Sequence, residues 1–157
     1  MPADIRLASM ADVDALTCIE DAAFDGDRLS RRSFRHLIGS SSAAVLVADD
    51  GSRLLGYAAV LFRKGAATAR LYSIAMAPGE RGRGNGRSLL AAAEASASAR
   101  HAASLRLEVR SGNDRARRLY ELSGYRRIGS IPGYYHDGAA AERFEKPLGR
   151  AQGLGGR

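Results

Sequence analysis

Glycines and arginines that follow a strand-length apolar run are the first residues that could do chemistry. Leu71 to Ala77 fits a strand, and Pro78-Gly79 ends it because proline cannot donate to a ladder. The residues that lead from there into a run of helix formers are Arg81, Gly82, Arg83, Gly84, Asn85, Gly86, Arg87 and Ser88. The first N–H groups of a helix lack internal partners, and the helix dipole makes that end partly positive. Glycines leave these groups open and arginines add charge, so we predict a phosphate or pyrophosphate site with one or two arginines on phosphate.

The spacing of the glycines selects among the known phosphate-binding loops. A P-loop needs a lysine after its last glycine, and none follows here. The third glycine of a dinucleotide fingerprint would fall on Leu89 or Arg87. Arg81-x-x-Gly84-x-Gly86 instead resembles the R/Q-x-x-G-x-G/A motif of the GNAT N-acetyltransferase superfamily. That motif binds the pyrophosphate of acetyl-coenzyme A, so the resemblance implies acetyl-CoA as cosubstrate.

A second segment, Leu107 to Tyr125, strengthens this resemblance. Its sequence, LEVRSGNDRARRLYELSGY, is similar to the family segment LEVR-x-x-N-x-x-A-x-x-LYE-x-x-GF/Y. The likeness is greatest to the Rim group, which acetylates N-terminal alanines of bacterial ribosomal proteins. Tyr134-Tyr135-His136-Asp137-Gly138 also resembles that group's YY-x-DG stretch. The resemblance covers about residues 3 to 148 and is clear from residue 70 onward.

The resemblance implies roles for individual residues. Glu108 corresponds to the proposed base, Tyr120 to the proposed acid, and Asn113 to a coenzyme A contact. The backbone of Ile74 and Met76 would bind the pantetheine amide and the acetyl carbonyl. Besides residues 81–88, the implied cofactor-binding residues are Ile74, Ala75, Met76, Asn113, Arg115 and Ala116.

The chemistry of amide formation also suits these residue types. Attack on a thioester needs a neutral amine, a stabilised oxyanion and a proton for the departing thiolate. An α-amine with a pKa of about 8 is far more often neutral at pH 7 than a lysine with a pKa of about 10.4. We therefore expect direct transfer, in a ternary complex, to the N-terminal α-amine of a peptide or protein. A small-molecule amine and a non-catalytic acyl-CoA sensor are the alternatives.

Both candidate catalytic residues have a structural alternative. Glu108 alternates with its apolar neighbours and lies beside Arg106 and Arg110 in the pattern, so it is a base, a substrate anchor or one half of a sheet-face ion pair. Tyr120 follows Ala116 by one helical turn and could simply pack in the core. A phenol with a pKa of about 10 nevertheless suits protonation of a thiolate whose acid has a pKa of about 8.5.

The acceptor should meet the segment between the first two helices. There the Rim group often carries a Pro-Trp pair, whereas this chain has acidic residues that could favour a cationic acceptor. The expected substrate-binding residues are Phe24, Asp25, Asp27, Glu108, Tyr134 and Tyr135.

These residues must be positioned by an α/β fold. Hydrophobic periodicity predicts strands at 5–8, 44–48, 54–62, 69–76, 105–110, 125–131 and 140–146. It predicts helices at 13–24, after Ser30, at 87–100 and at 114–123. Short turns make the strands at 44–76 antiparallel, and the crossover helix makes 69–76 parallel to 105–110. The order β-αα-βββ-α-β-α-ββ is that of the GNAT fold, which implies a mixed central sheet with helices on both faces.

Length and composition bound the remaining possibilities. The 157 residues predict one domain, residues 1–148, and a flexible tail, 149–157, in which four of nine residues are glycine. Lys and Arg outnumber Asp and Glu, 24 to 17, which favours an anionic partner. The arginines do not gather on one face with aromatics, so we expect no nucleic-acid role.

The remaining expectations concern metals, membranes and assembly. Three histidines and one cysteine without ligand spacing predict no metal site. The lone Cys18 should be a small buried helix residue. No apolar run is long enough to span a membrane, so we expect no membrane association, a cytoplasmic location, and a monomer or weak homodimer.

Overall fold

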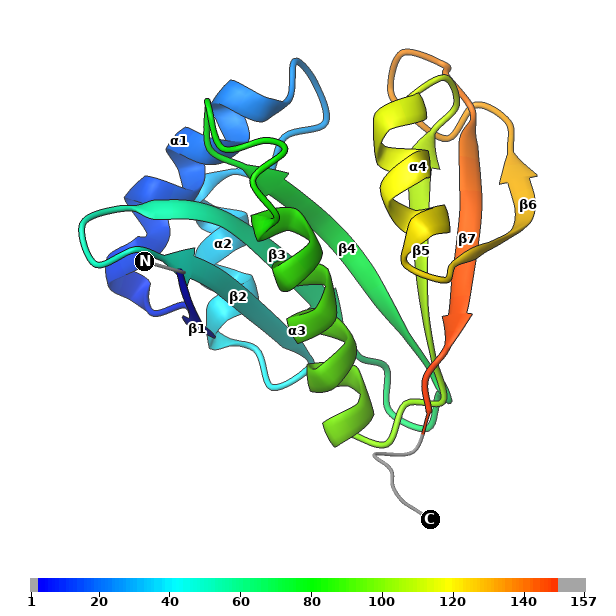
Figure 1. Cartoon of the computed structure of the whole chain (residues 1–157), viewed down its shortest axis with the longest axis horizontal. Coiled ribbons are helices and arrows are strands. Elements are labelled where there is room, and N and C mark those ends of the chain that lie inside the picture. The colour runs from blue at the N-terminus through cyan, green and yellow to red at the C-terminus, as the bar shows by residue number, and fades with distance from the viewer. Residues whose placement is uncertain (1–2, 150–157) are drawn as a thin grey trace.

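The computed structural model describes residues 3–149, and its element order is the one that the sequence predicts (Figure 1). Its elements are β1 (Asp4–Leu7), a 3₁₀ turn (Met10–Asp12), α1 (Val13–Ala23), α2 (Arg31–Gly39), β2 (Ala43–Asp49), β3 (Leu54–Leu61), β4 (Thr68–Met76), α3 (Asn85–Ala99), β5 (Ser104–Arg110), α4 (Asp114–Leu122), β6 (Arg126–Ile131) and β7 (Ala141–Pro147).

The strands form one mixed sheet in the order β1-β2-β3-β4-β5-β7-β6. β2, β3 and β4 are antiparallel neighbours, as their short turns predict. β4 and β5 are parallel, because the α3 crossover brings the chain back in the same direction. β7 lies between β5 and β6 and pairs antiparallel with both, a placement that local pattern does not predict.

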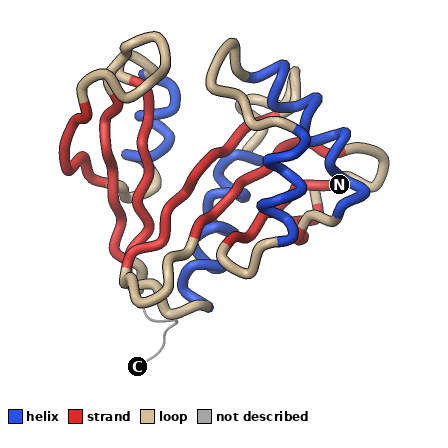
Figure 2. Tube along the Cα trace, turned by 180° about the vertical axis from the view of Figure 1, so that it is seen from behind, coloured by secondary structure: helices blue, strands red, loops and turns tan. Residues whose placement is uncertain are grey.

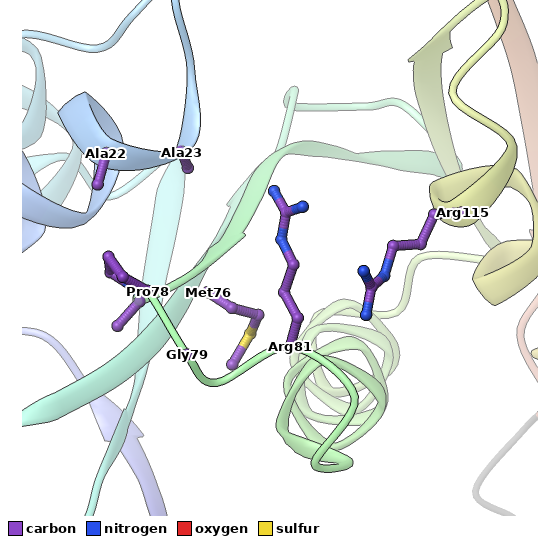
Figure 3. Close-up of a pocket in the computed structure, with 8 residues that line it drawn as sticks. Ala22, Ala23, Met76, Pro78, Gly79, Arg81 and Arg115 are labelled. Carbon is purple, nitrogen blue, oxygen red and sulfur yellow. The ribbon is translucent and has the colours of Figure 1, made fainter.

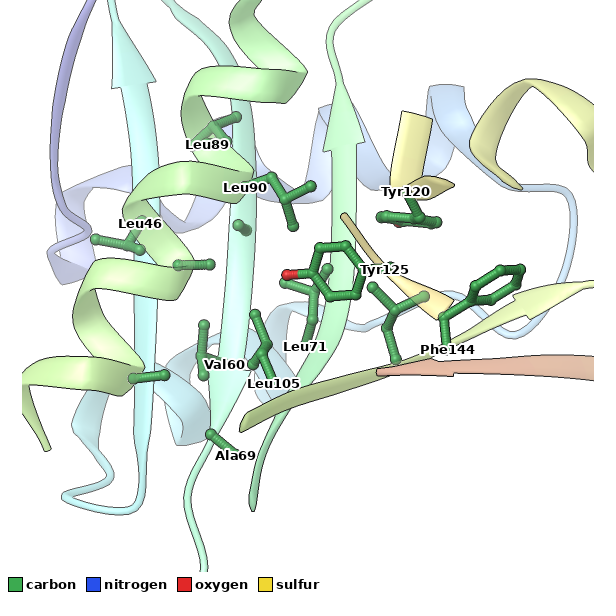
Figure 4. Packing of buried hydrophobic residues seen from close by; sticks show 14 of the residues in the cluster. Leu46, Val60, Ala69, Leu71, Leu89, Leu90, Leu105, Tyr120, Tyr125 and Phe144 are labelled. Carbon is green, nitrogen blue, oxygen red and sulfur yellow. The ribbon is translucent and has the colours of Figure 1, made fainter. Parts of the chain in front are cut away.

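Two apolar clusters cover the two faces of the sheet. On one face, α3 and α4 contribute Leu90 and Tyr120 to a cluster with Leu71, Leu105 and Phe144 (Figure 4). The opposite face is covered by α1 and α2, the two helices that lie in front of the strands in Figure 2. Strand residues alternate between these clusters, so side chains of β5 such as Glu108 point away from the face that carries Leu107 and Val109.

Two details differ from the sequence expectation. α3 begins at Asn85, before the predicted Arg87, because Gly84 adopts a left-handed conformation (φ 86°) that ends the loop. Cys18 is exposed, so the prediction of a buried cysteine is wrong: α1 turns this residue away from its apolar stripe. Residues 150–157 of the predicted tail lie outside the described residues. Within residues 3–149, no helix is long and apolar enough to cross a membrane.

Candidate active site

The parallel strands β4 and β5 diverge at the centre of the sheet. Their ladder runs only from Thr68 opposite Ser104 to Leu71 opposite Leu107. Beyond it the two strands separate, as Figure 1 shows, while β4 stays paired with β3 past an irregularity opposite Tyr72. From residue 72 to Met76, β4 therefore has one free edge. The backbone groups of Ile74 and Met76 point to this free edge, where the predicted role needs them. Those of Ala75 point to β3, as do those of Ala77, whose N–H donates to the Leu55 carbonyl.

The loop after β4 and the start of α3 have the geometry expected of an anion-binding site. Gly82 and Gly84 have φ values of 79° and 86°, which side-chain-bearing residues rarely adopt. The predicted arginines, Arg81, Arg83 and Arg87, are exposed, and none has an ion-pair partner among residues 3–149. Asn85, Gly86 and Ser88 make up the first turn of α3, whose N–H groups face the loop side. Unpaired guanidinium groups and helix N–H groups together suit a diphosphate.

A pocket of about 490 Å³ connects this loop with the free edge of β4. Arg81 and Arg115 extend into it from different elements, the loop and α4 (Figure 3). Its walls are formed by Ala22, Ala23, Met76, Ala77, Pro78, Gly79, Arg81 and Arg115. The pocket therefore joins two of the predicted cofactor-binding groups in one continuous space.

The loop's own carboxylate is neutralised by a residue that sequence reasoning missed. Glu80 directly precedes Arg81, yet its side chain is only 11% exposed and accepts a hydrogen bond of 2.5 Å from Arg53. Arg53 lies in the β2–β3 turn, 27 residues earlier, so no local pattern could have paired them. The pairing holds the loop against the sheet and removes a negative charge that would repel phosphate.

α4 places three of the predicted residues beside the gap. The Asn113 side chain accepts the Ala116 backbone N–H at 3.2 Å, so Asn113 caps the helix. Tyr120 is 5% exposed, and its ring packs against Tyr125 and Phe144. Burial raises the pKa of its hydroxyl above the ordinary value. Among residues 3–149 this hydroxyl has no hydrogen-bond partner, so it is available to donate a hydrogen bond to a ligand in the gap.

Glu108 lies between two arginines of neighbouring strands. Its Oε1 accepts Arg70 Nε at 2.8 Å and its Oε2 accepts Arg143 Nε at 3.0 Å. The carboxylate is 4% exposed, and Arg70 also donates to the Tyr134 hydroxyl. The sheet-face ion pair that the sequence allowed is therefore present, and its arginines are Arg70 and Arg143 rather than the sequence neighbours Arg106 and Arg110.

The geometry of a sheet explains why the partners differ. Arg106 pairs with Glu145 and Arg110 with Asp137, so neither contacts Glu108. Residues two positions apart on one strand are farther from each other than residues directly opposite on adjacent strands. Arg143 lies directly opposite Glu108 in the β5–β7 ladder, a register that the sequence alone does not reveal.

The predicted acceptor residues come together from the two ends of the chain. Asp27, at φ 53°, accepts the backbone N–H of His136 at 3.2 Å, which ties the α1–α2 loop to the β6–β7 loop. The rings of Tyr134 and Tyr135 pack edge to face, with centroids 5.0 Å apart. Burial raises the pKa of both hydroxyls. Asp25 is exposed, whereas Phe24 packs against the apolar cluster under α1 and α2.

Comparisons with known proteins agree with this geometry. A sequence profile described as "Acetyltransferase (GNAT) domain" matches residues 7–145. An uncharacterised protein of Mycobacterium leprae is 34% identical over 143 residues, which are 85% of this chain and 37% of that protein. The chain thus spans little more than a third of that relative's length.

Two crystal structures resemble the fold over nearly their whole length. The ribosomal-protein-S18-alanine N-acetyltransferase from Escherichia coli is 25% identical, with a TM-score of 0.82, over 96% of this chain and 99% of that one. The ribosomal-protein-alanine N-acetyltransferase from Brucella melitensis is 26% identical, with a TM-score of 0.79, over 92% of this chain and 99% of that one.

Proposed function

Because this chain belongs to the GNAT acetyltransferase family, we propose that it transfers the acetyl group of acetyl-CoA to the α-amine at the N-terminus of a peptide or protein. The observation that carries this proposal is the free edge of β4 next to the anion-binding loop. The loop and α3 would hold the pyrophosphate, and the backbone of Ile74 to Met76 would hold the pantetheine. The cosubstrate supplies a thioester carbonyl between the diverging strands.

Tyr120 is the proposed acid of the reaction. Its hydroxyl is buried beside the gap and carries its proton at neutral pH, as a phenol of ordinary pKa already does, and burial raises its pKa further. Burial makes the phenol a weaker acid, but the same water-free surroundings also disfavour the charge of the departing thiolate and so make the sulfur a stronger base. The absence of a protein partner for this hydroxyl within residues 3–149 supports the assignment.

Glu108 is proposed to organise the acceptor side of the gap. Both of its oxygens accept arginine N–H groups, so a base role would need one of these bonds to break. As observed, the carboxylate fixes Arg70 and Arg143, and Arg70 in turn holds Tyr134. We therefore place Glu108 at the substrate site, with anchoring favoured over proton abstraction.

Three observations support an α-amine acceptor. An α-amine needs less help with deprotonation than a lysine does. The acceptor side is formed by two loops that Asp27 joins, with the Tyr134 and Tyr135 rings available to an extended peptide. The two similar crystal structures bear the names of protein-alanine N-acetyltransferases.

A panel of synthetic peptides tests this function. Each peptide is incubated with acetyl-CoA and the protein, and acetylation is located by tandem mass spectrometry. We expect acetyl groups on free α-amines and none on lysine side chains or on N-terminally blocked controls. Turnover of polyamines or aminoglycosides without turnover of any peptide would reject the proposal.

A small cationic amine is the second candidate acceptor. The exposed carboxylate of Asp25 favours it, because Asp25 lies two residues before Asp27 in the α1–α2 loop and makes no hydrogen bond or ion pair within the described residues. The same assay decides between the two acceptors, since Asp25→Asn should lower the acetylation of small cationic amines and leave the acetylation of peptides unchanged.

A further inference from the structure

A buried hydrogen-bond chain runs from α1 to the edge of the gap. Glu20 is 1% exposed, and its Oε1 accepts the Tyr57 hydroxyl at 2.5 Å. The Tyr57 oxygen lies 2.7 Å from the Ser73 hydroxyl oxygen on β4. The other Glu20 oxygen accepts the Leu29 backbone N–H at 2.8 Å. The three side chains come from α1, β3 and β4, which no sequence pattern links.

Counting donors fixes the direction of this chain. A carboxylate can only accept, so the single proton of the Tyr57 hydroxyl points to Glu20. Ser73 must then donate its own proton to the Tyr57 oxygen. This arrangement leaves the lone pairs of Ser73 Oγ as the outer end of the chain, ready to accept an N–H group.

Ser73 lies where the incoming amine would pass. The β4–β5 ladder ends at Leu71, so Ser73 belongs to the free edge, immediately before Ile74. Its side chain is half-buried, and within residues 3–149 its hydroxyl has no hydrogen-bond partner besides Tyr57. Glu108, the other carboxylate near the gap, is already held by two guanidinium groups.

We propose that Ser73 accepts a proton from the acceptor ammonium group and that Tyr57 and Glu20 carry it away. This inference rests on the proposed amine acetylation. The ammonium N–H proton passes to Ser73 Oγ, the Ser73 proton to Tyr57 and the Tyr57 proton to Glu20, which becomes a neutral acid. The amine nitrogen then forms the C–N bond, the C–S bond breaks, and sulfur takes the Tyr120 proton. The second nitrogen proton restores Tyr120, and Glu20 releases its proton to solvent after the product leaves.

The surroundings of Glu20 suit a proton acceptor. Burial raises its pKa, and the neighbouring Asp21 charge raises it further. The Leu29 N–H, the Tyr57 hydroxyl and the more distant Arg28 charge act in the opposite direction but leave the pKa raised. A buried carboxylate of this kind takes up a proton more readily than an exposed one.

Three variants with steady-state kinetics test the chain. Ser73→Ala removes the outer acceptor, Ser73→Thr keeps it, and Ser104→Ala is the matched control. Ser104 shares a hydrogen bond of 2.9 Å with Thr68 at the closed end of the same two strands. At pH 7, Ser73→Ala should lower kcat for a peptide about tenfold or more, the range of a general base, with the KM for acetyl-CoA unchanged. Ser73→Thr should retain most activity, and Ser104→Ala all of it.

The pH profile separates proton transfer from a structural effect. The Ser73→Ala defect should shrink as pH rises above the pKa of the α-amine, about 8, because the amine then arrives neutral. A defect of equal size at every pH, or no defect relative to Ser104→Ala, would overturn the inference. Glu20→Gln gives a second measurement: it should lower kcat at neutral pH as Ser73→Ala does. A wild-type protein that acetylates no peptide would instead refute the proposed function.

Discussion

At the scale of single residues, the site is defined by which charges are paired. Arg81, Arg83, Arg87 and Arg115 have no ion-pair partner within residues 3–149, whereas Arg70 and Arg143 share one carboxylate. The four unpaired guanidinium groups lie on the loop and helices where we predict the pyrophosphate, and the two paired ones lie at Glu108, where we predict the acceptor.

Glu108→Gln should test the structural part of this pattern. The substitution leaves two guanidinium groups without their counter-charge beside a 4% exposed side chain. Breaking a fully buried ion pair costs about 3–5 kcal/mol of stability. Both arginines are more than a third exposed, so solvent screens the pair and we expect the free energy of unfolding to fall by about 1–2 kcal/mol. Urea denaturation measures it. Glu145→Gln, which removes a more exposed partner of Arg106, is the control and should cost less.

Tyr120→Phe should separate catalysis from stability. The hydroxyl is buried without a partner in the described part of the chain, so its removal should leave the melting temperature unchanged or raised. We expect kcat to fall by about 10- to 100-fold, as for loss of a general acid, with little change in the KM for acetyl-CoA.

Tyr125→Phe is the control for Tyr120→Phe, because it should change stability and not catalysis. Its hydroxyl donates to Glu94 at 2.8 Å, so this variant should lose stability and keep kcat. A Tyr120→Phe protein with wild-type kcat would favour the acyl-CoA sensor, or another acid, over the proposed role.

At the scale of elements, the strand, loop and helix from β4 to α3 act as one unit. β4 supplies a free backbone edge, the loop supplies positive φ angles and arginines, and α3 supplies its N–H groups. The Arg53–Glu80 bond ties this unit to the β2–β3 turn (2.5 Å). The strand, the loop and the helix are consecutive in sequence, which explains why this half of the site is predictable, although the Arg53–Glu80 bond is not.

Alanine substitutions at Gly84 and Gly86 should distinguish backbone strain from ligand approach. Gly84 has φ 86°, so Gly84→Ala should cost about 1–2 kcal/mol of stability and weaken acetyl-CoA binding. A Cβ at Gly86 would meet Met76 Sδ at 3.9 Å, an ordinary contact, in a helical backbone. Gly86→Ala is therefore the control: it should fold normally and keep most of its acetyl-CoA affinity, because the last position of the motif accepts Gly or Ala. Isothermal calorimetry and thermal melts measure both variants, and a Gly84→Ala protein with unchanged affinity would contradict the predicted pyrophosphate site.

At the scale of the whole molecule, two apolar clusters on opposite faces hold a sheet that opens between β4 and β5. The pocket is lined by the end of α1, the loop after β4 and Arg115 of α4, and Asp27 joins the two predicted acceptor loops. We predict that both substrates meet in the gap, as direct transfer in a ternary complex requires.

Acid should destabilise the whole fold through its paired carboxylates. Ser111 and Arg127 lower the pKa of Glu142 to about 2, and Arg6 lowers that of Asp12. A carboxylate with a depressed folded-state pKa stabilises the fold above its unfolded value of about 4.5, and that stability is lost as pH falls toward 2. Glu20 has the opposite effect on stability. Burial raises its pKa in the folded state, so its protonation at low pH removes a buried charge and favours the fold.

Glu142→Gln isolates one of these contributions. Urea unfolding of the variant and the wild type is compared between pH 6 and pH 2. The stability difference should be greatest near pH 6 and shrink as pH falls, because the wild-type carboxylate becomes protonated. Two curves that stay parallel over this range would contradict the assignment.

The sequence by itself determined the element order, the glycine-rich turn between β4 and α3, and the helix that carries Tyr120. Turns, caps and glycine conformations depend on neighbouring residues, and hydrophobic periodicity depends only on spacing, so both can be read along the chain. The roles assigned to Glu108, Tyr120 and the acceptor loops stay predictions, because bound substrates alone can test them.

Only the tertiary structure decided which distant side chains meet. The partners of Glu108, the Arg53–Glu80 bond and the Glu20–Tyr57–Ser73 chain join residues that lie 16 to 38 positions apart. Such contacts depend on strand register and on which helix packs on which face. The position of β7 between β5 and β6 brings Arg143 opposite Glu108, and the packing of α1 on β3 brings Glu20 to Tyr57.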